Sequence, residues 1–188
     1  EKRIKQYPFE LSGGMRQRVM IAMALACEPD ILIADEPTTA LDVTIQAQIL
    51  ELMQDLQKKL GMAVILVTHD LGVIADMCDN IIVMYGGHIC ERGTADEIFY
   101  NPRHEYTKGL LRSIPNVNNM KEKLIPIAGT PINVLNLPKG CAFCARCDEA
   151  MKICLEQQPE ELTINENHKA ACWMNVRRML EEEGGAAQ

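Results

Sequence analysis

Two adjacent carboxylates, Asp35 and Glu36, follow an apolar run at residues 31–34 and precede Pro37. An apolar run without polar alternation is typical of a strand in a parallel sheet that is covered on both faces. Carboxylates at the carboxyl end of such a strand lie where open α/β sheets bind ligands. Because two adjacent carboxylates are costly to desolvate, a divalent cation is their natural partner. The alternative is a solvated turn before the proline.

A second group with chemical potential is Ser12, Gly13 and Gly14, at the start of an apolar helical run. Free backbone N–H groups and the positive dipole end can hold an anion there, and glycines allow a ligand to approach the backbone closely. Ser12 can also cap the helix. The alternative is an ordinary N-capped core helix.

His69 follows a second apolar run, at residues 63–67. A single histidine after a strand is usually structural, and the residues alone assign it no other role.

Hydrophobic spacing predicts the elements that position these groups. A helix starts near Met15, and its apolar residues at helical spacing are Met15, Val19, Ala22, Met23 and Ala26. A helix over 43–60 ends at Gly61, and its apolar face is Ile45, Ile49, Leu52, Met53, Leu56 and Leu60. Shorter helices cover 71–78 and 108–114. A third strand at 80–84 turns through Gly86 and Gly87 into a returning strand. Further predicted details are Thr94 as an N-cap, His88 and Glu91 as surface hairpin residues, and an irregular linker over 116–138.

The composition limits the classes of function. The 188 residues are 47% hydrophobic with a formal net charge of −7, which predicts a folded protein without a basic surface for nucleic acid. The longest apolar run covers residues 19–27, far too short to span a bilayer. Three of the eight cysteines, Cys27, Cys78 and Cys90, lie among apolar neighbours and are predicted core residues.

The segments Leu11-Ser12-Gly13-Gly14-Met15 and Asp35-Glu36-Pro37, at this spacing, resemble the signature and Walker B motifs of ABC-type ATPases. Residues 38–42 resemble the D-loop, although position 39 is Thr where these ATPases more often have Ser. The position of His69 matches the switch histidine.

This resemblance implies ATP and Mg²⁺ as cofactors and a role for each residue. Asp35 would hold Mg²⁺, Glu36 would act on the attacking water, and His69 would lie near the γ-phosphate. Ser12, Gly13 and Gly14 would face a nucleotide held by a second ATPase subunit. Asp42 would couple the two sites across that interface.

No GxxxxGK[ST] phosphate loop occurs in these residues. The resemblance therefore implies the C-terminal part of a longer subunit, inactive on its own. The expected fold class is α/β, a partial P-loop NTPase core with a mainly parallel sheet and a small irregular Cys-rich extension. The expected divisions are the ATPase part at 1–100, a helix and linker at 101–140, and the extension at 141–188.

The region from Asn101 onward resembles the C-terminal extension of ATP-binding subunits of oligopeptide, dipeptide and nickel importers. The residues that carry this resemblance are Pro102, His104, Tyr106, Thr107, Leu110, Leu111, Gly140, Cys141, Phe143, Arg146, Cys147, Cys154, Pro159, His168 and Cys172. It implies a [4Fe–4S] cluster on Cys141, Cys147, Cys154 and Cys172.

The spacing of the cysteines leaves other metal sites open. Cys141, Cys144 and Cys147 form C-x2-C-x2-C, as in ferredoxin-type loops, with Cys154 or Cys172 as a remote fourth ligand. The ligand set that the resemblance implies is preferred, and it leaves Cys144 as a spare cysteine. Zinc on four thiolates is the second choice of metal, and an extension without metal is the third reading. His168 could replace one cysteine, although a loop histidine is more often exposed.

The leading functional hypothesis is an ATPase subunit that powers peptide import, with a nickel importer and a non-catalytic fragment with a metal-binding module as alternatives. The implied partners are a second, paralogous ATPase subunit, two transmembrane permeases and an extracytoplasmic solute-binding protein. The implied location is the cytoplasmic face of a bacterial or archaeal membrane. A chromosome-maintenance ATPase shares the motifs, but the chain has neither long heptads nor a basic face.

Overall fold

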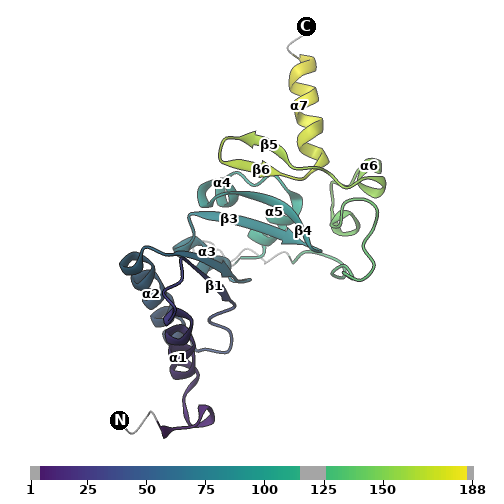
Figure 1. The fold of residues 1–188 in the computed structure, drawn as a ribbon. Coiled ribbons are helices and arrows are strands. Elements are labelled where there is room, and N and C mark those ends of the chain that lie inside the picture. The colour runs from purple at the N-terminus through teal and green to yellow at the C-terminus, as the bar shows by residue number, and fades with distance from the viewer. Residues whose placement is uncertain (1–4, 115–125, 186–188) are drawn as a thin grey trace, which may run out of the picture. The chain divides into compact units, whose positions relative to one another are not determined.

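The computed structural model describes residues 5–114 and 126–185. The chain divides into two compact units, residues 1–77 and 78–188 (Figure 1). The predicted division near residues 100 and 140 stays a prediction. Part of the predicted linker, residues 116–125, lies outside the described residues, and residues 126–138 contain no helix or strand.

Unit 1 alternates helices with strands, as the hydrophobic spacing predicts. After a short 3-10 helix at Pro8–Glu10 come α1 (Gly13–Leu25), β1 (Ile31–Asp35), α2 (Val43–Leu60), β2 (Ala63–Val67) and α3 (Leu71–Met77). Gly61 ends α2 in the left-handed conformation, with φ 66°, which is the predicted stop signal.

The two strands of unit 1 are parallel and in register from Ile31–Ala63 to Asp35–Val67. Their carboxyl ends therefore meet at one edge, which brings the residues after each strand together. The expectation that β1 is covered on both faces is wrong for the described chain, because Ile31 and Ile33 are more than half exposed.

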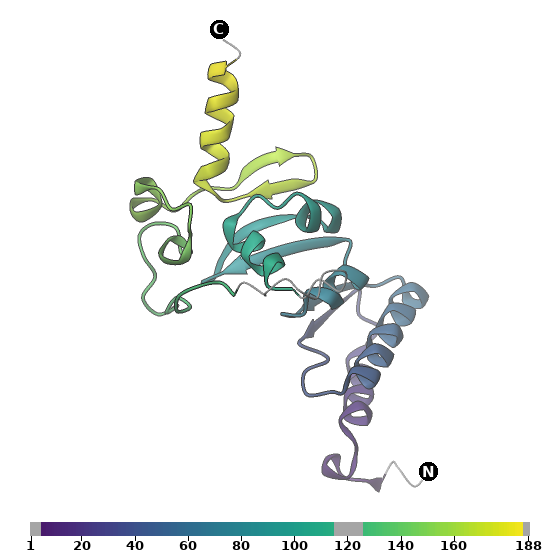
Figure 2. The same cartoon turned by 180° about the vertical axis from the view of Figure 1, so that it is seen from behind.

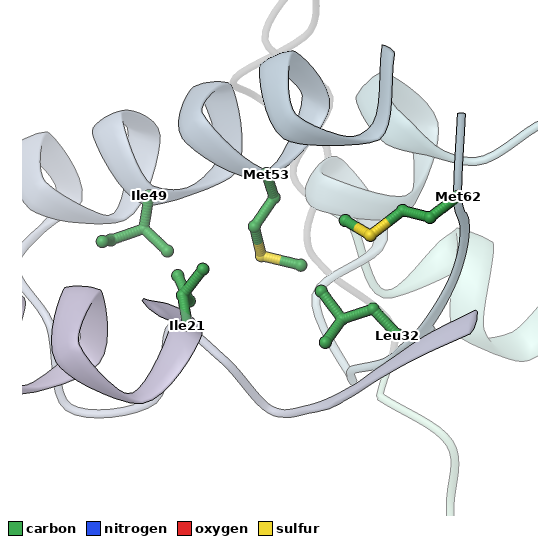
Figure 3. Packing of buried hydrophobic residues seen from close by; sticks show 5 residues of the cluster. All are labelled: Ile21, Leu32, Ile49, Met53 and Met62. Atoms are coloured by element: carbon green, nitrogen blue, oxygen red, sulfur yellow. The ribbon is translucent and has the colours of Figure 1, made fainter. Parts of the chain in front are cut away.

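The core of unit 1 lies between α1, α2 and the strands (Figure 3). Its buried side chains are Ile21, Leu32, Ile49, Met53 and Met62, of which Ile49 and Met53 are fully buried. The predicted apolar face of α2 packs here, except Leu60, which is half exposed. The apolar face predicted for α1 is wrong, since Val19 and Met23 are exposed while Ile21 is buried.

Unit 2 is built on an antiparallel sheet of order β3-β4-β6-β5. Its elements are β3 (Asn80–Tyr85), β4 (His88–Thr94), α4 (Ala95–Tyr100), α5 (Glu105–Arg112), a 3-10 turn (Cys144–Arg146), α6 (Lys152–Glu156), β5 (Leu162–Asn165), β6 (His168–Ala170) and α7 (Trp173–Gly185). Seen from behind, α5 lies against the face of this sheet (Figure 2).

The α/β class is confirmed, but two parts of the predicted fold are wrong. Among the described strands only β1 and β2 pair in parallel, so the sheet is not mainly parallel. The region after residue 140 is not irregular either, since β6 pairs with β4 and thereby joins the sheet begun by β3.

Local signals in unit 2 were informative. Gly86 and Gly87 have φ of 56° and 80°, the left-handed values that a two-residue hairpin turn requires. Thr94 caps α4 by accepting a hydrogen bond from the Glu97 amide. The helix predicted over 108–114 begins earlier, because the His104 side chain caps α5 at Glu105.

An aromatic cluster anchors the segment that follows α5. The rings of Tyr85, Tyr106 and Phe143 lie 4.7 to 5.3 Å apart, between centroids. Arg146 donates to the carbonyl oxygens of Ile127 and Ala128 at 2.9 and 2.8 Å. These contacts fix residues 126–143, which contain no helix or strand, against unit 2. None of the helices in the described chain is long and apolar enough to cross a membrane.

Candidate functional site

The carboxyl edge of the parallel pair gathers the polar residues of unit 1. The backbone N–H of Glu36 donates to the Val67 carbonyl oxygen at 2.8 Å, which extends the pairing by one residue beyond β1. Glu36 itself has a φ of 44°, a conformation that costs a residue with a side chain about 1 kcal/mol or more. This turn directs the chain away from the sheet directly after Asp35.

Both carboxylate oxygens of Glu36 have partners. Oε1 lies 2.9 Å from His69 Nδ1, and Oε2 accepts a hydrogen bond from the Thr39 hydroxyl at 2.7 Å. These two contacts lower the pKa of Glu36, Thr39 contributing most. The side chain is therefore an ionised carboxylate with a fixed orientation at the edge of the sheet, and it remains accessible to solvent.

The structure thus brings Glu36 and His69 together across 33 residues, as expected if they act at one site. Thr39 was identified in the sequence only as a departure from the usual motif, and nothing predicted its bond to Glu36. Asp70, next to the histidine, was also missed. Its carboxylate accepts from the amides of Gly72 and Val73 at the start of α3 and from the Gln46 side chain.

The predicted anion-binding residues lie at the start of α1. The Ser12 hydroxyl caps the helix by accepting from the Met15 amide at 3.4 Å. A Cβ on Gly14 would lie 2.5 Å from Cγ2 of Ile45, so this glycine also allows α1 and α2 to approach closely. No hydrogen bond joins Ser12 to Glu36 within the described residues.

Asp42 caps α2, because its carboxylate accepts from the Ile45 amide at 3.0 Å. Asp35 is exposed at the last position of β1. Both carboxylates are accessible, as a role at a nucleotide or a subunit interface would require. The assignment of these residues to a catalytic site stays a prediction.

Five cysteines of unit 2 line one small pocket: Cys141, Cys144, Cys147, Cys154 and Cys172. The Cys141 amide donates to the Cys154 carbonyl oxygen at 2.8 Å, which fixes the loop against α6. Gly140 makes this approach possible, since a Cβ there would overlap the Cys154 carbonyl oxygen. The pocket therefore contains all four predicted metal ligands and the spare, Cys144.

The environment of these thiols favours their neutral form when no cation is present. Burial raises the pKa of Cys141 to about 11 and that of Cys147 to about 12, and neighbouring cysteines add to each shift. In the part of the chain that the structure describes, no group of three or more His, Cys, Asp or Glu side chains is arranged to hold a metal ion. The donor set fits a thiophilic metal, but a metal centre is not shown.

The remaining cysteines divide three ways. Cys90 is buried, as predicted, and burial raises its pKa to about 12. The prediction is wrong for Cys27, which is exposed, and Cys78 is half-buried.

Two further predictions in unit 2 need correction. Glu91 is not a surface hairpin residue, since it is completely buried on β4. His168 is not an exposed loop histidine, because it is buried on β6 and its ring nitrogens contact the carboxylates of Glu91 and Glu97. The sequence did not predict β5 and β6, so neither contact could be anticipated.

Comparison with known proteins first defines a class. Residues 1–39 match the ABC transporter family, and residues 90–154 match the family "Oligopeptide/dipeptide transporter, C-terminal region". The first match ends at Thr39, so it includes the signature and Walker B segments.

Curated relatives are more specific. The dipeptide transport ATP-binding protein DppD of Bacillus subtilis is 54% identical over 94% of the chain and 53% of the relative. The oligopeptide transport ATP-binding protein OppD of the same species is 58% identical over 93% of the chain and 49% of the relative. OppD of Escherichia coli is 52% identical over 95% of the chain and 53% of the relative.

The chain is therefore a homologue of the ATP-binding subunits of oligopeptide and dipeptide ABC transporters, which confirms the resemblance seen in its motifs. It spans about half the length of the curated relatives it matches. A solved structure of an ATP-binding cassette, a dimer bound to ADP and Pi, is 38% identical in sequence. The match covers 50% of this chain and 40% of the cassette chain, with a TM-score of 0.45.

Proposed function

We propose that this chain is part of the ATP-hydrolysing subunit of a peptide importer. The observation that carries the proposal is the pair formed by Glu36 and His69 at the carboxyl edge of the parallel strands. Homology to DppD and OppD over more than nine-tenths of the chain supports the same function. Oligopeptides or dipeptides are the proposed cargo; nickel is the alternative that the homologues do not favour.

In this proposal each residue at the edge has one task. Asp35 holds Mg²⁺, which would neutralise charge on the phosphates. The Glu36 carboxylate orients the attacking water and accepts its proton, for which its ionised form is required. His69 fixes one carboxylate oxygen and Thr39 the other, so the base does not have to be ordered during the reaction.

The proposed partner is a second ATPase subunit. Ser12, Gly13 and Gly14 would contact the nucleotide of that subunit through the start of α1, where free N–H groups bind anions. Asp42 would lie near the same interface. Two permeases and a solute-binding protein complete the proposed importer, at the cytoplasmic face of the membrane.

The test of this function uses the full-length subunit. Glu36→Gln is expected to bind ATP normally and to lose ATP hydrolysis by about 100-fold or more. Glu51→Gln, at an exposed position of α2, is the matched control and is expected to hydrolyse ATP at the normal rate. Unchanged hydrolysis by Glu36→Gln would contradict the proposal.

The isolated chain gives a second test. Because its 188 residues contain no GxxxxGK[ST] loop, we propose that it does not bind ATP tightly or hydrolyse it alone. Titration with ATP and Mg²⁺, followed by calorimetry, measures this directly. Tight binding by the isolated chain would favour a separate nucleotide site that the motifs do not describe.

A second proposed function concerns the cysteine pocket. Five cysteines line one pocket, and their thiol chemistry is the support for a metal centre, with Cys141, Cys147, Cys154 and Cys172 as ligands of a [4Fe–4S] cluster and zinc as the alternative. Because the described side chains are not arranged to hold a metal, binding would require the thiols to move together. Such a centre would lower the cost of bringing thiolates together and would link α6 and α7 to the loop after Gly140.

Anaerobic purification with elemental analysis tests this centre. Iron with broad visible absorbance is expected, whereas zinc without colour would identify the alternative. Cys147→Ser is expected to lose the metal, and Cys144→Ser is the matched control, because Cys144 is the spare cysteine of the same pocket. A preparation free of both metals would contradict the proposal.

A further inference from the structure

Unit 2 contains a buried group of three ionisable side chains that neither proposed function uses. It consists of Glu91 on β4, Glu97 on α4 and His168 on β6. The side chains of Glu91 and His168 are 0% exposed, and that of Glu97 is 25% exposed. The ring nitrogens of His168 lie 2.7 Å from Glu91 Oε1 and 3.1 Å from Glu97 Oε2.

The other contacts of both carboxylates come from N–H donors. Glu91 accepts from the backbone N–H groups of Arg103 and His104, at 2.6 and 2.9 Å. Glu97 accepts from the side-chain amides of Asn101 and Asn165, and these bonds lower its pKa. The amide donors around Glu97 favour its ionised form, and the two backbone N–H groups that Glu91 accepts favour a carboxylate there as well.

An ionised carboxylate only accepts hydrogen bonds. With both carboxylates ionised, each ring nitrogen of His168 faces an acceptor, and a ring that donates from both nitrogens is the imidazolium cation. A completely buried Glu91 needs such a cation, since an isolated charge away from water is very costly.

The neighbouring charged groups do not replace His168 in this role. His104 is neutral, because its Nδ1 accepts from the Tyr106 amide and burial lowers its pKa to about 4. Arg92 on β4 pairs with Glu161 at 2.6 Å instead. Lys169 follows His168 on β6 and lies in register with Arg92, whereas Glu91 is in register with Ala170.

The pairing of β6 with β4 gives this cation a structural consequence. His168 is the first residue of β6 and lies in register with Gly93 of β4. A Cβ added at Gly93 would lie 3.3 Å from the His168 ring, so the absence of a side chain there leaves room for the ring. Two residues after His168 the strand ends, and the Ala171 amide donates to the Cys90 carbonyl oxygen at 2.8 Å. Cys172, which lines the cysteine pocket, follows directly.

We propose that His168 is a doubly protonated latch, through which the β5–β6 hairpin is held on β4 and α4. Only three residue pairs join β4 and β6, so the two ion pairs of His168 contribute most to holding the hairpin on the sheet. Loss of the cation releases the hairpin and with it the wall of the pocket at Cys172. This latch requires neither ATP nor a metal, so its test is independent of both proposed functions.

The charge of the ring is measured by NMR on the ¹⁵N-labelled chain at pH 7.5, with His168 assigned from the spectrum of His168→Gln. Two ring nitrogens with directly bonded protons are expected. One bare ring nitrogen at His168 would overturn the proposal, and this arm needs only the unmutated protein.

Hydrogen exchange of residues 162–170 measures the latch itself. In His168→Gln the buried Glu91 charge loses its partner, so exchange of these amides is expected to accelerate about 100-fold or more. The matched control Lys169→Gln also removes one positive charge from β6, but outside the group, and is expected to leave exchange nearly unchanged. Equal effects of the two variants would overturn the proposal.

A double variant separates lost charge from lost packing. His168→Gln with Glu91→Gln removes both members of the buried ion pair, so the double variant is expected to exchange more slowly than the product of the two single effects predicts. Simple multiplication of the two effects would show that the residues act independently, and would also overturn the proposal.

Discussion

His104 makes the stability of unit 2 sensitive to acid. The side chain is 3% exposed and caps α5, where its Nδ1 accepts a hydrogen bond from the Tyr106 amide. Burial lowers the pKa of this histidine from 6.5 to about 4. Protonation therefore costs more in the folded state than in the unfolded state, and it also removes the acceptor that caps the helix.

The sign and the size follow from linkage. Between pH 6.5 and pH 4 the unfolded chain binds the proton and the folded chain does not, so stability is complete above pH 6.5 and is lost as the pH falls. At pH 5 these two pKa values correspond to a loss of about 2 kcal/mol in the free energy of unfolding.

Trp173 is the single tryptophan of the chain, and it lies in unit 2 with its indole N–H bonded to the Gln157 carbonyl oxygen. Its fluorescence during urea unfolding therefore reports on this unit. The unmutated chain and His104→Asn are compared at pH 7.5 and pH 5, since asparagine can cap a helix but does not titrate.

The difference between the two proteins isolates the histidine, because all other titrating groups are common to both. The variant is expected to lose about 2 kcal/mol less than the unmutated chain between the two pH values. Parallel losses in both proteins would refute a depressed pKa at His104 and with it the neutral assignment used for the buried group around Glu91.

Two further predictions concern packing. Ile49→Ala, at a completely buried position of unit 1, is expected to lower the free energy of unfolding by about 2–5 kcal/mol. Leu60→Ala, at a half-exposed position of α2, is expected to change it by about 0.5 kcal/mol or less. Urea unfolding followed by circular dichroism compares the two variants. Gly140→Ala would force the Cys154 and Leu155 carbonyl groups to move, so it is expected to destabilise unit 2 by at least about 2 kcal/mol by Trp173 fluorescence. Gly87→Ala meets no neighbour and is expected to lose only about 1 kcal/mol, from its positive φ, so equal losses would contradict the steric argument.

The sequence predicted unit 1 well because its signals are local. Continuous apolar runs gave β1 and β2, and Gly61 gave the end of α2. Residues after two parallel strands must meet at one edge, so the approach of His69 to Glu36 follows from the pattern. Thr39 could not be identified in this way, because its bond to Glu36 depends on the positive φ that turns the chain after β1.

Unit 2 was predicted less well because its organisation depends on a long-range pairing. The strands β5 and β6 are four and three residues long, too short for an alternating pattern to be recognised. Without β6 there was no reason to place Glu91 inside, and a charged residue after a Gly-Gly turn is usually exposed. Its burial becomes understandable only when His168, 77 residues later, supplies the opposite charge.

Strand β4 explains why the hairpin and the Cys-rich region form one unit. Cys90 packs with the aromatic cluster around Tyr85 and Phe143, whereas Glu91, the next residue, is paired with His168. Cys90 thus holds the loop around Phe143, and Glu91, the next residue of the same strand, holds the β5–β6 hairpin before Cys172. Since both segments lead into cysteines that line the pocket, the geometry of the pocket depends on a strand that precedes all five of its cysteines.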